Sequence, residues 1–472
     1  MKSLMWFRND LRIDDNPALK SACIFSDEVH AVYIYSPNQN KEHNEANCKI
    51  EFIIENLKIL EKELSSKNIP LTLIESDGFY DNPQLISEYV NTNSIKKVFF
   101  NNQFGINEHH RDNLVRSSLQ KQNIEFEAFD EQVVFEPGTI LTGEGRPYSV
   151  FTPFKRKWIE NFNIDILDIE FEHTVKKQTN IKSNIQEFDF KFKKSHSVDM
   201  SLWLPGEEEA MHRLRRYLEE KIYRYAQDRN DPIIEGTSRL SAYLASGIIS
   251  PKRCILEALK INNFELDTGE KGITKWIDEI IWREFYKNIM FSFPKVSMNK
   301  PFQDYTNNIQ WRFDEYEFNS WCNGETGFPI IDSAMKQLKN EGWMHNRLRM
   351  VVAMFFTKNM LHDWRLGEAF FMQNLIDGDF SSNNGGWQWS SSTGTDAAPY
   401  FRIFNPITQS KNFDSKGLFI KKYIKELNDV DVKEIHDPDV ETRSACGYPM
   451  QIVNLKDSRI RAIDAFNESK NS

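Results

Sequence analysis

The sequence predicts an α/β domain followed by a region that is helical almost throughout. In residues 1–130 short β-rich runs alternate with helical stretches, and from Glu207 onward the apolar residues keep a helical spacing. Between the two, the stretch from Lys176 to Ser197 is rich in Lys, Asn, Gln and Ser, which is typical of a surface connection. The chain of 472 residues is long enough for two or three domains, and we expect domains at 1–130 and 206–472 joined by a linker at 131–205.

Four strands are expected in the first part of the chain, at Leu4–Phe7, Val29–Tyr35, Leu71–Glu75 and Lys97–Asn101. Helical patterns lie between or after them, at 44–64, 83–89 and 111–120. Strands separated by helices indicate a parallel, doubly wound sheet. The first strand is followed by Arg8-Asn9-Asp10 and lacks the glycine fingerprint of dinucleotide-binding domains, so an ordinary NAD domain is excluded.

The charge is unevenly distributed. The net charge is −10, but residues 1–150 hold 15 basic against 23 acidic residues, and the remainder holds 44 against 46. A basic face, and hence a nucleic-acid partner, therefore remains open for the second part of the chain. The five scattered cysteines form no Cys-x-x-Cys pair and fit a reducing compartment. We see neither a signal peptide nor an apolar run long enough to cross a membrane.

Tryptophan is concentrated in one part of the chain. Of the 11 tryptophans, eight are Trp276, Trp282, Trp311, Trp321, Trp343, Trp364, Trp387 and Trp389. The simpler interpretation is a large helical core. The alternative is a site for a flat ligand or for electron transfer, and the count alone leaves both open.

Two predicted helices carry polar and aromatic residues at the spacing i, i+3, i+4 and i+7. The first stripe is Glu279, Trp282, Arg283 and Tyr286, and the second is Trp343, Asn346, Arg347 and Met350. One such stripe fits a solvated face. Two of similar chemistry favour walls that line a polar ligand.

Two further segments are candidates for ligand binding. The segment Glu235–Ser241 predicts a helix start capped by Thr237 and Ser238, which with Arg239 would suit a phosphate, although taken alone an ordinary capped helix is the simpler interpretation. In Asp377–Trp389, Asp379 and Asn383 would face one ligand edge if the segment is helical. A metal is disfavoured there because a hard cation needs more oxygen ligands than this stretch supplies.

These segments also carry a family resemblance. Together with the opening Trp6–Arg12, the phrases Gly236–Ser241, Trp343–Met350, Asp377–Trp389, Thr393–Asp396 and Pro399–Arg402 resemble the photolyase/cryptochrome flavoproteins nearly end to end. The chain is most similar to class I cyclobutane pyrimidine dimer (deoxyribodipyrimidine) photolyases. The resemblance implies an N-terminal α/β antenna domain, a long connection and a C-terminal helical FAD-binding domain.

The resemblance assigns roles by position. FAD would be held by Tyr225, Thr237, Ser238, Arg239, Leu240, Ser241, Arg349, Asp377, Gly378, Asp379 and Asn383, with Asn383 facing flavin N5. Trp387, Trp364 and Trp311 would relay electrons from flavin to surface. The dimer would contact Glu279, Trp282, Asn346, Arg347, Met350 and Trp389, and DNA would also contact Arg229 and Gln409. The catalytic set is then Glu279, Asn383, Trp311, Trp364 and Trp387.

A second chromophore is implied as well. His43, Asn107 and Glu108 match a methenyltetrahydrofolate antenna site, but Ser297-Met298 stand where the family usually offers a lysine, so a deazaflavin remains open. The activity implied is that of a carbon–carbon lyase. It splits dimers in double- or single-stranded DNA by electron transfer from photoexcited reduced FAD. We expect a monomer in the bacterial cytoplasm, held at the nucleoid by DNA and not at a membrane.

Two members of the same family remain as alternatives. A cryptochrome often has a long C-terminal tail and another residue at the N5 position, whereas here about 50 residues follow Lys422 and position 383 is Asn. A (6-4) photolyase needs an acid–base histidine beside the lesion, and near the expected site only His345 is present. A generic flavin dehydrogenase would need a nicotinamide site, which we do not find.

Overall fold

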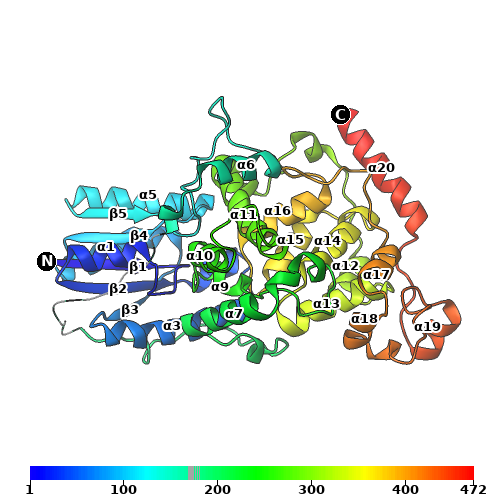
Figure 1. Cartoon of the computed structure of the whole chain (residues 1–472), viewed down its shortest axis with the longest axis horizontal. Coiled ribbons are helices and arrows are strands. Elements are labelled where there is room, and N and C mark those ends of the chain that lie inside the picture. Colours follow the sequence, from blue (N-terminus) through cyan, green and yellow to red (C-terminus); the bar gives the residue numbers. More distant parts are fainter. Residues whose placement is uncertain (168, 170–174, 176, 178, 180, 472) are drawn as a thin grey trace. The chain divides into compact units, whose positions relative to one another are not determined.

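The computed structural model describes residues 1–471 except 168, 170–174, 176, 178 and 180. Contacts divide the chain into two compact units (Figure 1). Unit 1 consists of Met1–Ser195, Trp203–Glu220 and Ser238–Pro294, and unit 2 of His196–Leu202, Lys221–Thr237 and Lys295–Ser472. These units are defined by contacts and do not test where the two domains and the linker expected from the sequence begin and end.

Unit 1 is built on a parallel sheet of five strands, so the doubly wound fold is confirmed. The strands are β1 (Lys2–Phe7), β2 (Glu28–Tyr35), β3 (Leu71–Glu75), β4 (Lys97–Asn101) and β5 (Glu125–Phe129), in the order β3-β2-β1-β4-β5. Trp6 at the centre pairs with Val32 on one side and Phe100 on the other. The sequence analysis missed β5, an edge strand in which Glu125 and Glu127 interrupt the apolar run.

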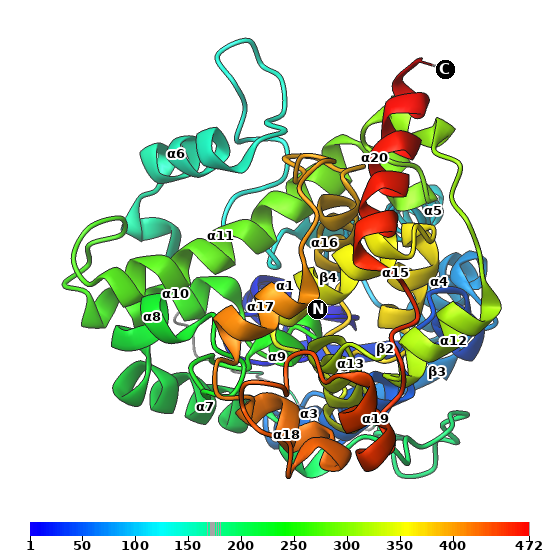
Figure 2. The same ribbon diagram turned by 90° about the vertical axis from the view of Figure 1, so that its right-hand side faces the viewer.

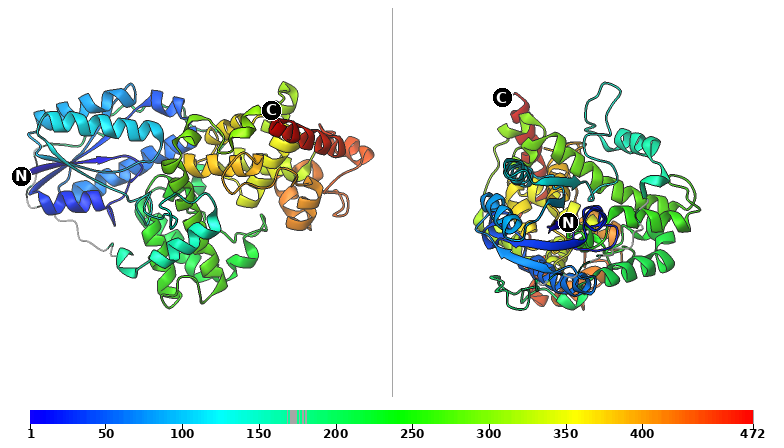
Figure 3. Two further views of the ribbon diagram at one scale, coloured as in Figure 1. Left: turned by 90° about the horizontal axis from the view of Figure 1, so that it is seen from above. Right: turned by 90° about the vertical axis from the view of Figure 1, so that its left-hand side faces the viewer.

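Helices cover both faces of this sheet, as two further views show (Figure 3). Ile86 and Val90 of one helix and Val115 of another pack with Leu4 and Trp6 on one face. The helices of unit 1 are α1 (Pro17–Phe25), α2 (Pro37–Glu42), α3 (Asn47–Ser66), α4 (Asn82–Thr92), α5 (Ile106–Lys121), α6 (Phe151–Asn161), α7 (Glu207–Glu220), α9 (Ser241–Ala245), α10 (Pro251–Ile261) and α11 (Lys271–Ser292).

The polar residues after β1 have structural partners. The Asp10 carboxylate accepts hydrogen bonds from the Arg8 backbone N–H and from Asn101 Nδ2, each at 2.6 Å. The Arg12 guanidinium is buried and pairs with Glu131 at 2.6 Å and with Asp15 at 2.6 Å. The Arg8–Arg12 stretch therefore closes the carboxyl edge of the sheet instead of cradling a dinucleotide.

The polar stretch from residue 176 to Ser197 is irregular where the structure describes it; residues 176, 178 and 180 lie outside the described residues. It nevertheless packs on unit 1. Phe188, Phe190 and Phe192, at a spacing of two, lie against Tyr35 and the neighbouring core residues of α3. The composition of the stretch did not predict this packing, because three aromatic residues are few among so many polar ones.

Unit 2 is helical, and most of its helices can be followed in Figure 2. They are α8 (Tyr225–Asp228), α12 (Glu315–Asn323), α13 (Pro329–Glu341), α14 (Asn346–Met354), α15 (Trp364–Met372), α16 (Phe380–Ser391), α17 (Pro406–Phe413), α18 (Leu418–Tyr423), α19 (Val440–Cys446) and α20 (Leu455–Asn471). A π-helical turn, Phe355–Asn359, follows α14. Among the helices that the structure describes, none has the length and apolar character needed to cross a bilayer.

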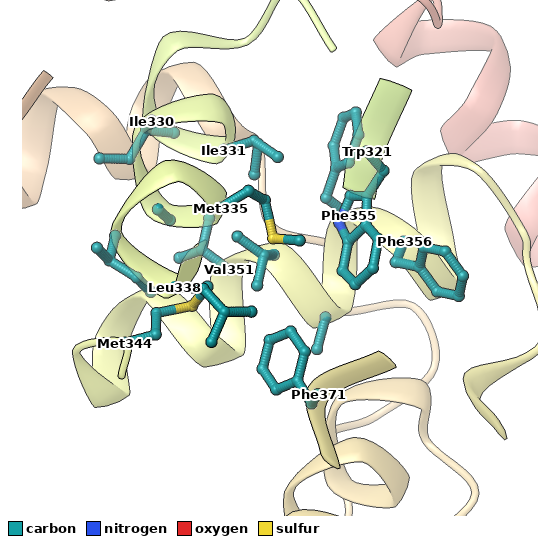
Figure 4. Packing of buried hydrophobic residues seen from close by; sticks show 14 of the residues in the cluster. Trp321, Ile330, Ile331, Met335, Leu338, Met344, Val351, Phe355, Phe356 and Phe371 are labelled. Carbon is teal, nitrogen blue, oxygen red and sulfur yellow. The ribbon is translucent and has the colours of Figure 1, made fainter. Parts of the chain in front are cut away.

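The core of unit 2 is rich in aromatic residues (Figure 4). Trp321, Phe355, Phe356 and Phe371 are buried in one cluster with aliphatic and Met side chains from α13 and α14. Trp321 and Phe356 lie with ring centroids 4.5 Å apart. Much of the tryptophan-rich segment therefore does form a core, as the simpler interpretation of the sequence holds.

Lys358 lies inside this unit, in the π-helical turn. Its side chain is fully buried, donates a hydrogen bond to Ser392 Oγ at 2.6 Å and lies 4.3 Å from the centroid of the Phe466 ring. Burial lowers the pKa of its ammonium group to about 7.

This burial makes the stability of unit 2 depend on pH. An unfolded lysine keeps its proton to about pH 10.4, so between about pH 7 and pH 10 the unfolded chain binds more protons than the folded one. The free energy of unfolding should therefore rise with pH in this range, by up to about 1.4 kcal/mol per unit. Lys358→Met should abolish the rise in urea titrations, whereas exposed Lys433→Met should keep it. An equal rise in the Lys358→Met variant would contradict the assignment.

Candidate functional site

The first predicted stripe lies on α11 of unit 1. Glu279, Trp282 and Tyr286 are half-buried, whereas most neighbouring residues of the helix are buried. Arg283 is committed elsewhere, because its guanidinium donates to the carbonyl oxygens of Gln132 at 2.5 Å and Leu244 at 3.2 Å. The stripe therefore presents a carboxylate and two aromatic rings, while its arginine holds the fold together.

The segment before α9 differs from the prediction. The helix begins at Ser241, and Thr237 and Ser238 lie four and three residues before it without capping it. The reason is a bend in the backbone, since Arg239 has a φ of +50°. Ser238, Arg239, Leu240 and Ser241 belong to unit 1, whereas Thr237 and Tyr225 belong to unit 2.

The second predicted stripe is only partly helical. Trp343 is buried before α14, which begins at Asn346 after the cap residue His345. Asn346 is exposed, and Arg347 and Met350 are half-buried on the helix itself. The expected repeat of the α11 arrangement is therefore wrong for Trp343, because the chain turns before the helix starts.

Three arginines of unit 2 lie close together. Arg347 donates to Asn230 Oδ1 at 2.7 Å and lies 4.5 Å from the ring centroid of Phe413 on α17, the helix that also carries Gln409. Its pKa is lowered by burial and by the neighbouring charges of Arg229 and Arg402. The sequence analysis assigned roles to Arg229 and Arg347 but gave none to Arg402, because only the fold brings it to the other two.

The segment Asp377–Trp389 is helical from Phe380 onward, as α16. Asp379 caps this helix, and its Oδ1 accepts hydrogen bonds from Ser381 Oγ at 2.6 Å and Ser382 N at 2.9 Å. Asp377, beside Gly378, is buried and pairs with Arg349 at 2.7 Å. Asp379 is thus the cap of α16, and Asn383 lies one turn later on the same helix.

Asn383 is held in one orientation. Its Nδ2 donates to the backbone oxygen of Glu368 on α15 at 3.0 Å, while Asn384 Nδ2 donates to the Glu368 carboxylate at 2.8 Å. Burial raises the pKa of Glu368 to about 7. This bond orients the amide of Asn383, so that its Oδ1 points away from the Glu368 carbonyl and can accept a hydrogen bond from a ligand. The sequence analysis missed Glu368, which has no motif of its own.

Trp387, Trp364 and Trp311 belong to one aromatic cluster. Trp387 and Trp364 are buried in the core of unit 2, and half-exposed Trp311 packs against it. Trp311 touches Phe466 with ring centroids 6.1 Å apart. Among the described residues, Trp364 Nε1 has no hydrogen-bond partner. Trp389, two residues after Trp387, is half-buried.

Unit 1 brings His43, Asn107 and Glu108 together although they come from different segments. His43 Nδ1 lies 3.5 Å from Glu108 Oε1, and its Nε2 lies 3.4 Å from Asn107 Nδ2. The His43 ring also packs on Phe79 at 5.1 Å. In unit 2, Met298 is exposed at the end of a 3₁₀ turn, Pro294–Met298. No group of three or more potential metal ligands occurs in the described part of the chain.

Comparison with known proteins covers nearly the whole chain. A family model described as DNA photolyase matches residues 3–175, and one described as the FAD binding domain of DNA photolyase matches residues 276–468. The chain is 40% identical over 471 residues to the deoxyribodipyrimidine photo-lyase of Escherichia coli K12, which covers 99% of this chain and 98% of the relative. The chain belongs to the DNA photolyase family.

Solved structures of this family share the fold. A bacterial class III photolyase from Agrobacterium tumefaciens matches with a TM-score of 0.89 and 30% identity, over 100% of this chain and 98% of that one. An archaeal photolyase from Sulfolobus tokodaii, described with two FAD molecules, matches at 0.83 and 27%, over 99% and 100%. A Synechocystis cryptochrome matches at 0.85 and 23%, over 98% and 99%, which speaks for the fold alone.

A glycine of α15 gives a direct test of how Trp387 is packed. A Cβ added at Gly367 would overlap the six-membered ring of Trp387, whereas one added at Gly386 on α16 would meet nothing within 4 Å. Gly367→Ala should displace the indole and lower the free energy of unfolding by about 1–3 kcal/mol. Gly386→Ala, the matched control, should be neutral or stabilising by up to about 1 kcal/mol. Thermal melts compare the two, and equal stabilities would show that Trp387 does not pack as described.

Proposed function

We propose that this protein is a light-dependent DNA repair enzyme, a carbon–carbon lyase that splits cyclobutane pyrimidine dimers with reduced FAD as its cofactor. The observation that carries the proposal is the composition of α16. This one helix holds an oriented amide at Asn383, a buried indole at Trp387 and a half-buried indole at Trp389. A full-length relative that is 40% identical and named deoxyribodipyrimidine photo-lyase supports the same activity.

The chemistry of the donor set fits FAD. The hydroxyl groups of Thr237, Ser238 and Ser241 with the Arg239 guanidinium suit phosphate groups, and Tyr225 and Leu240 offer apolar surface. Gly378 and the Asp377–Arg349 pair, with the capping carboxylate of Asp379, offer polar atoms for the ribose and the ring. When bound, reduced FAD excited by blue light supplies the electron that opens the cyclobutane ring of the dimer and takes that electron back.

Asn383 would meet the flavin ring through its oxygen. The amide NH₂ is held by the Glu368 backbone, so Oδ1 can accept a hydrogen bond from a protonated N5. Glu368 and Asn384 hold each other below this contact. In this arrangement Glu368 positions Asn383 and need not touch the cofactor.

The tryptophans would carry electrons to an oxidised cofactor and restore its reduced state. An indole that has lost an electron becomes strongly acidic. A nearby base would take its proton and thereby stop further electron transfer. Trp364 Nε1 has no hydrogen-bond acceptor among the described residues, so its oxidised indole would keep its proton and could take an electron from the next tryptophan. Trp311 is half-exposed and can release its proton to water, which fits the last position of the relay.

The lesion would be recognised outside the base stack of the DNA duplex. A dimer within a duplex cannot reach a buried cofactor and must be flipped out. Trp282 and Trp389 offer faces for stacking, Met350 offers apolar contact, and Glu279 and Asn346 can bond base edges. The cluster of Arg229, Arg347 and Arg402 suits backbone phosphates, with Gln409 nearby on α17, and would add affinity without sequence selectivity.

We infer a methenyltetrahydrofolate antenna at His43, Asn107 and Glu108, because an imidazole, an amide and a carboxylate converge there on the surface of unit 1. We also infer a monomer that acts on double- or single-stranded DNA in the bacterial cytoplasm and is held at the nucleoid by DNA. The division into antenna domain, connection and FAD-binding domain at residues 130 and 205 is part of the same proposal.

A variant of the last relay position tests this function. Trp311→Phe should stop the light-driven reduction of oxidised flavin in the presence of external reductant. Chemically reduced variant should still split dimers in blue light, because the relay serves the cofactor and not the lesion. Trp321→Phe is the matched control, since Trp321 lies in the same core but is fully buried, and it should keep light-driven reduction. Absence of dimer loss with reduced parent protein in light would refute the function itself.

DNA binding should separate phosphate contacts from lesion contacts. Arg347→Ala should weaken binding to damaged and undamaged duplex alike and lower the salt slope by about one counterion. Trp282→Ala should instead reduce the preference for damaged duplex, because it removes a stacking surface of about 1–3 kcal/mol. Gel shifts over a salt series measure both. The assignment is wrong if the two variants behave alike.

A further inference from the structure

One face of the Trp282 indole is already occupied within unit 1. The ring of Phe151 lies parallel to it, with centroids 3.6 Å apart and an angle of 8° between the planes. At this separation nothing can enter between the rings. Phe285 meets the same indole edge-on at 5.7 Å, and Tyr286 lies beside it at 5.7 Å. Only the opposite face of Trp282 is left for a stacked base.

Phe151 is itself fixed by the helix that it begins. Phe154 and Trp158 follow it on α6 at i+3 and i+7, and all three are buried. Phe154 packs on Phe285 of α11 at 5.3 Å, and Trp158 Nε1 donates to Glu284 at 2.8 Å. The two helices are therefore joined along their length, and Phe151 cannot move away from Trp282 without breaking this contact.

The chain that leads into α6 is tied to the same helix. Glu284 also accepts hydrogen bonds from the backbone N–H of Val134 at 2.6 Å and Phe135 at 3.2 Å, and Asn288 Oδ1 accepts one from Gly138 N at 3.2 Å. Glu284 is buried with these donors. The segment expected to be a connection is thus attached to α11 on both sides of the loop between residues 138 and 151.

We propose that Phe151 is a positioning residue for lesion recognition: it holds the Trp282 indole in one plane, so that the face opposite Phe151 can receive the flipped-out dimer. The inference rests on the proposed contact of Trp282 with the lesion. A tryptophan on a half-buried helix face would otherwise change rotamer, and binding would have to order it. The stacked phenyl ring orders it before DNA arrives.

The test is a comparison of Phe151→Ala with Phe151→Tyr. Phe151→Ala should raise the KM for dimer-containing duplex by about 2- to 10-fold, the range expected for ordering one side chain at binding. Light-saturated turnover and binding to undamaged duplex should stay unchanged. Phe151→Tyr should restore the KM of the parent, because its ring can stack in the same way. Should Phe151→Ala fail to fold, Phe151→Leu takes its place.

Phe154→Leu is the matched control for lost packing. Its ring belongs to the same helix but contacts Phe285 and Tyr148, so this variant should lower the melting temperature and keep the KM of the parent. A parental KM in Phe151→Ala, together with a raised KM in Trp282→Ala, would overturn the inference and leave the proposed function intact. A parental KM in both variants would overturn the inference together with the assigned role of Trp282. A KM raised equally in Phe151→Ala and Phe154→Leu would overturn it as well, since loss of packing alone would then explain the effect.

Discussion

The buried guanidinium of Arg12 joins the parallel sheet of unit 1 to helices α9 and α10 of the same unit. Arg12 stands just after the first strand, and its charge is balanced by Glu131 and Asp15. Burial alone would lower its pKa, but these two carboxylates outweigh burial and raise the pKa well above the ordinary value. The same guanidinium donates to the Gly247 carbonyl oxygen at 3.0 Å, where helices α9 and α10 meet.

The backbone of Asn9 lies so close to Gly247 that no residue with a side chain fits at this position. Gly247 has a φ of +66°, and a Cβ there would overlap the Asn9 carbonyl group. The edge of the sheet and the turn between α9 and α10 therefore touch through backbone. Helix α11 is the next helix after α10 and packs against it, so the helix of Glu279 and Trp282, which we assign to the lesion, is tied to this contact through α10. An unpaired Arg12 would be costly to bury, which makes this contact hard to rearrange.

In unit 2 the constraint is close packing of aromatic rings. Trp387 meets Phe371 at 5.0 Å and Trp321 at 6.1 Å, and Gly367 leaves the space that its indole fills. The same packing keeps water away from Trp364, whereas Trp311 stays at the surface. In the relay that we propose, burial would decide which oxidised indole can release its proton, and burial follows from the fold and not from the spacing of tryptophans in the sequence.

The sequence predicted what depends on local pattern. The four apolar strands and the helix that carries Glu279 and Trp282 follow from periodicity, and the structure has them. Strand β5 was missed because its glutamates break the apolar run. The prediction that Thr237 and Ser238 cap a helix was wrong because Arg239 adopts a left-handed conformation, which no pattern in the sequence predicts.

Contacts between segments that are distant in the sequence could not be predicted from the sequence pattern. Phe151 meets Trp282 across 131 positions of the sequence, and Arg402 joins Arg347 only once the chain has folded. The resemblance to a family assigned the proposed relay tryptophans, but the orientation of Asn383, and the lack of an acceptor for Trp364 Nε1 within the described residues, became visible only in three dimensions.

Product analysis tests the central claim most directly. An oligonucleotide with a single cyclobutane thymine dimer would be incubated with anaerobically reduced protein, in blue light and in the dark, and analysed by chromatography and mass spectrometry. The account predicts, in light only, conversion to the strand of unchanged mass that elutes with undamaged oligonucleotide, since both pyrimidines are restored without loss of an atom. An unaltered dimer in light, equal conversion in the dark, or a cleaved strand would contradict it.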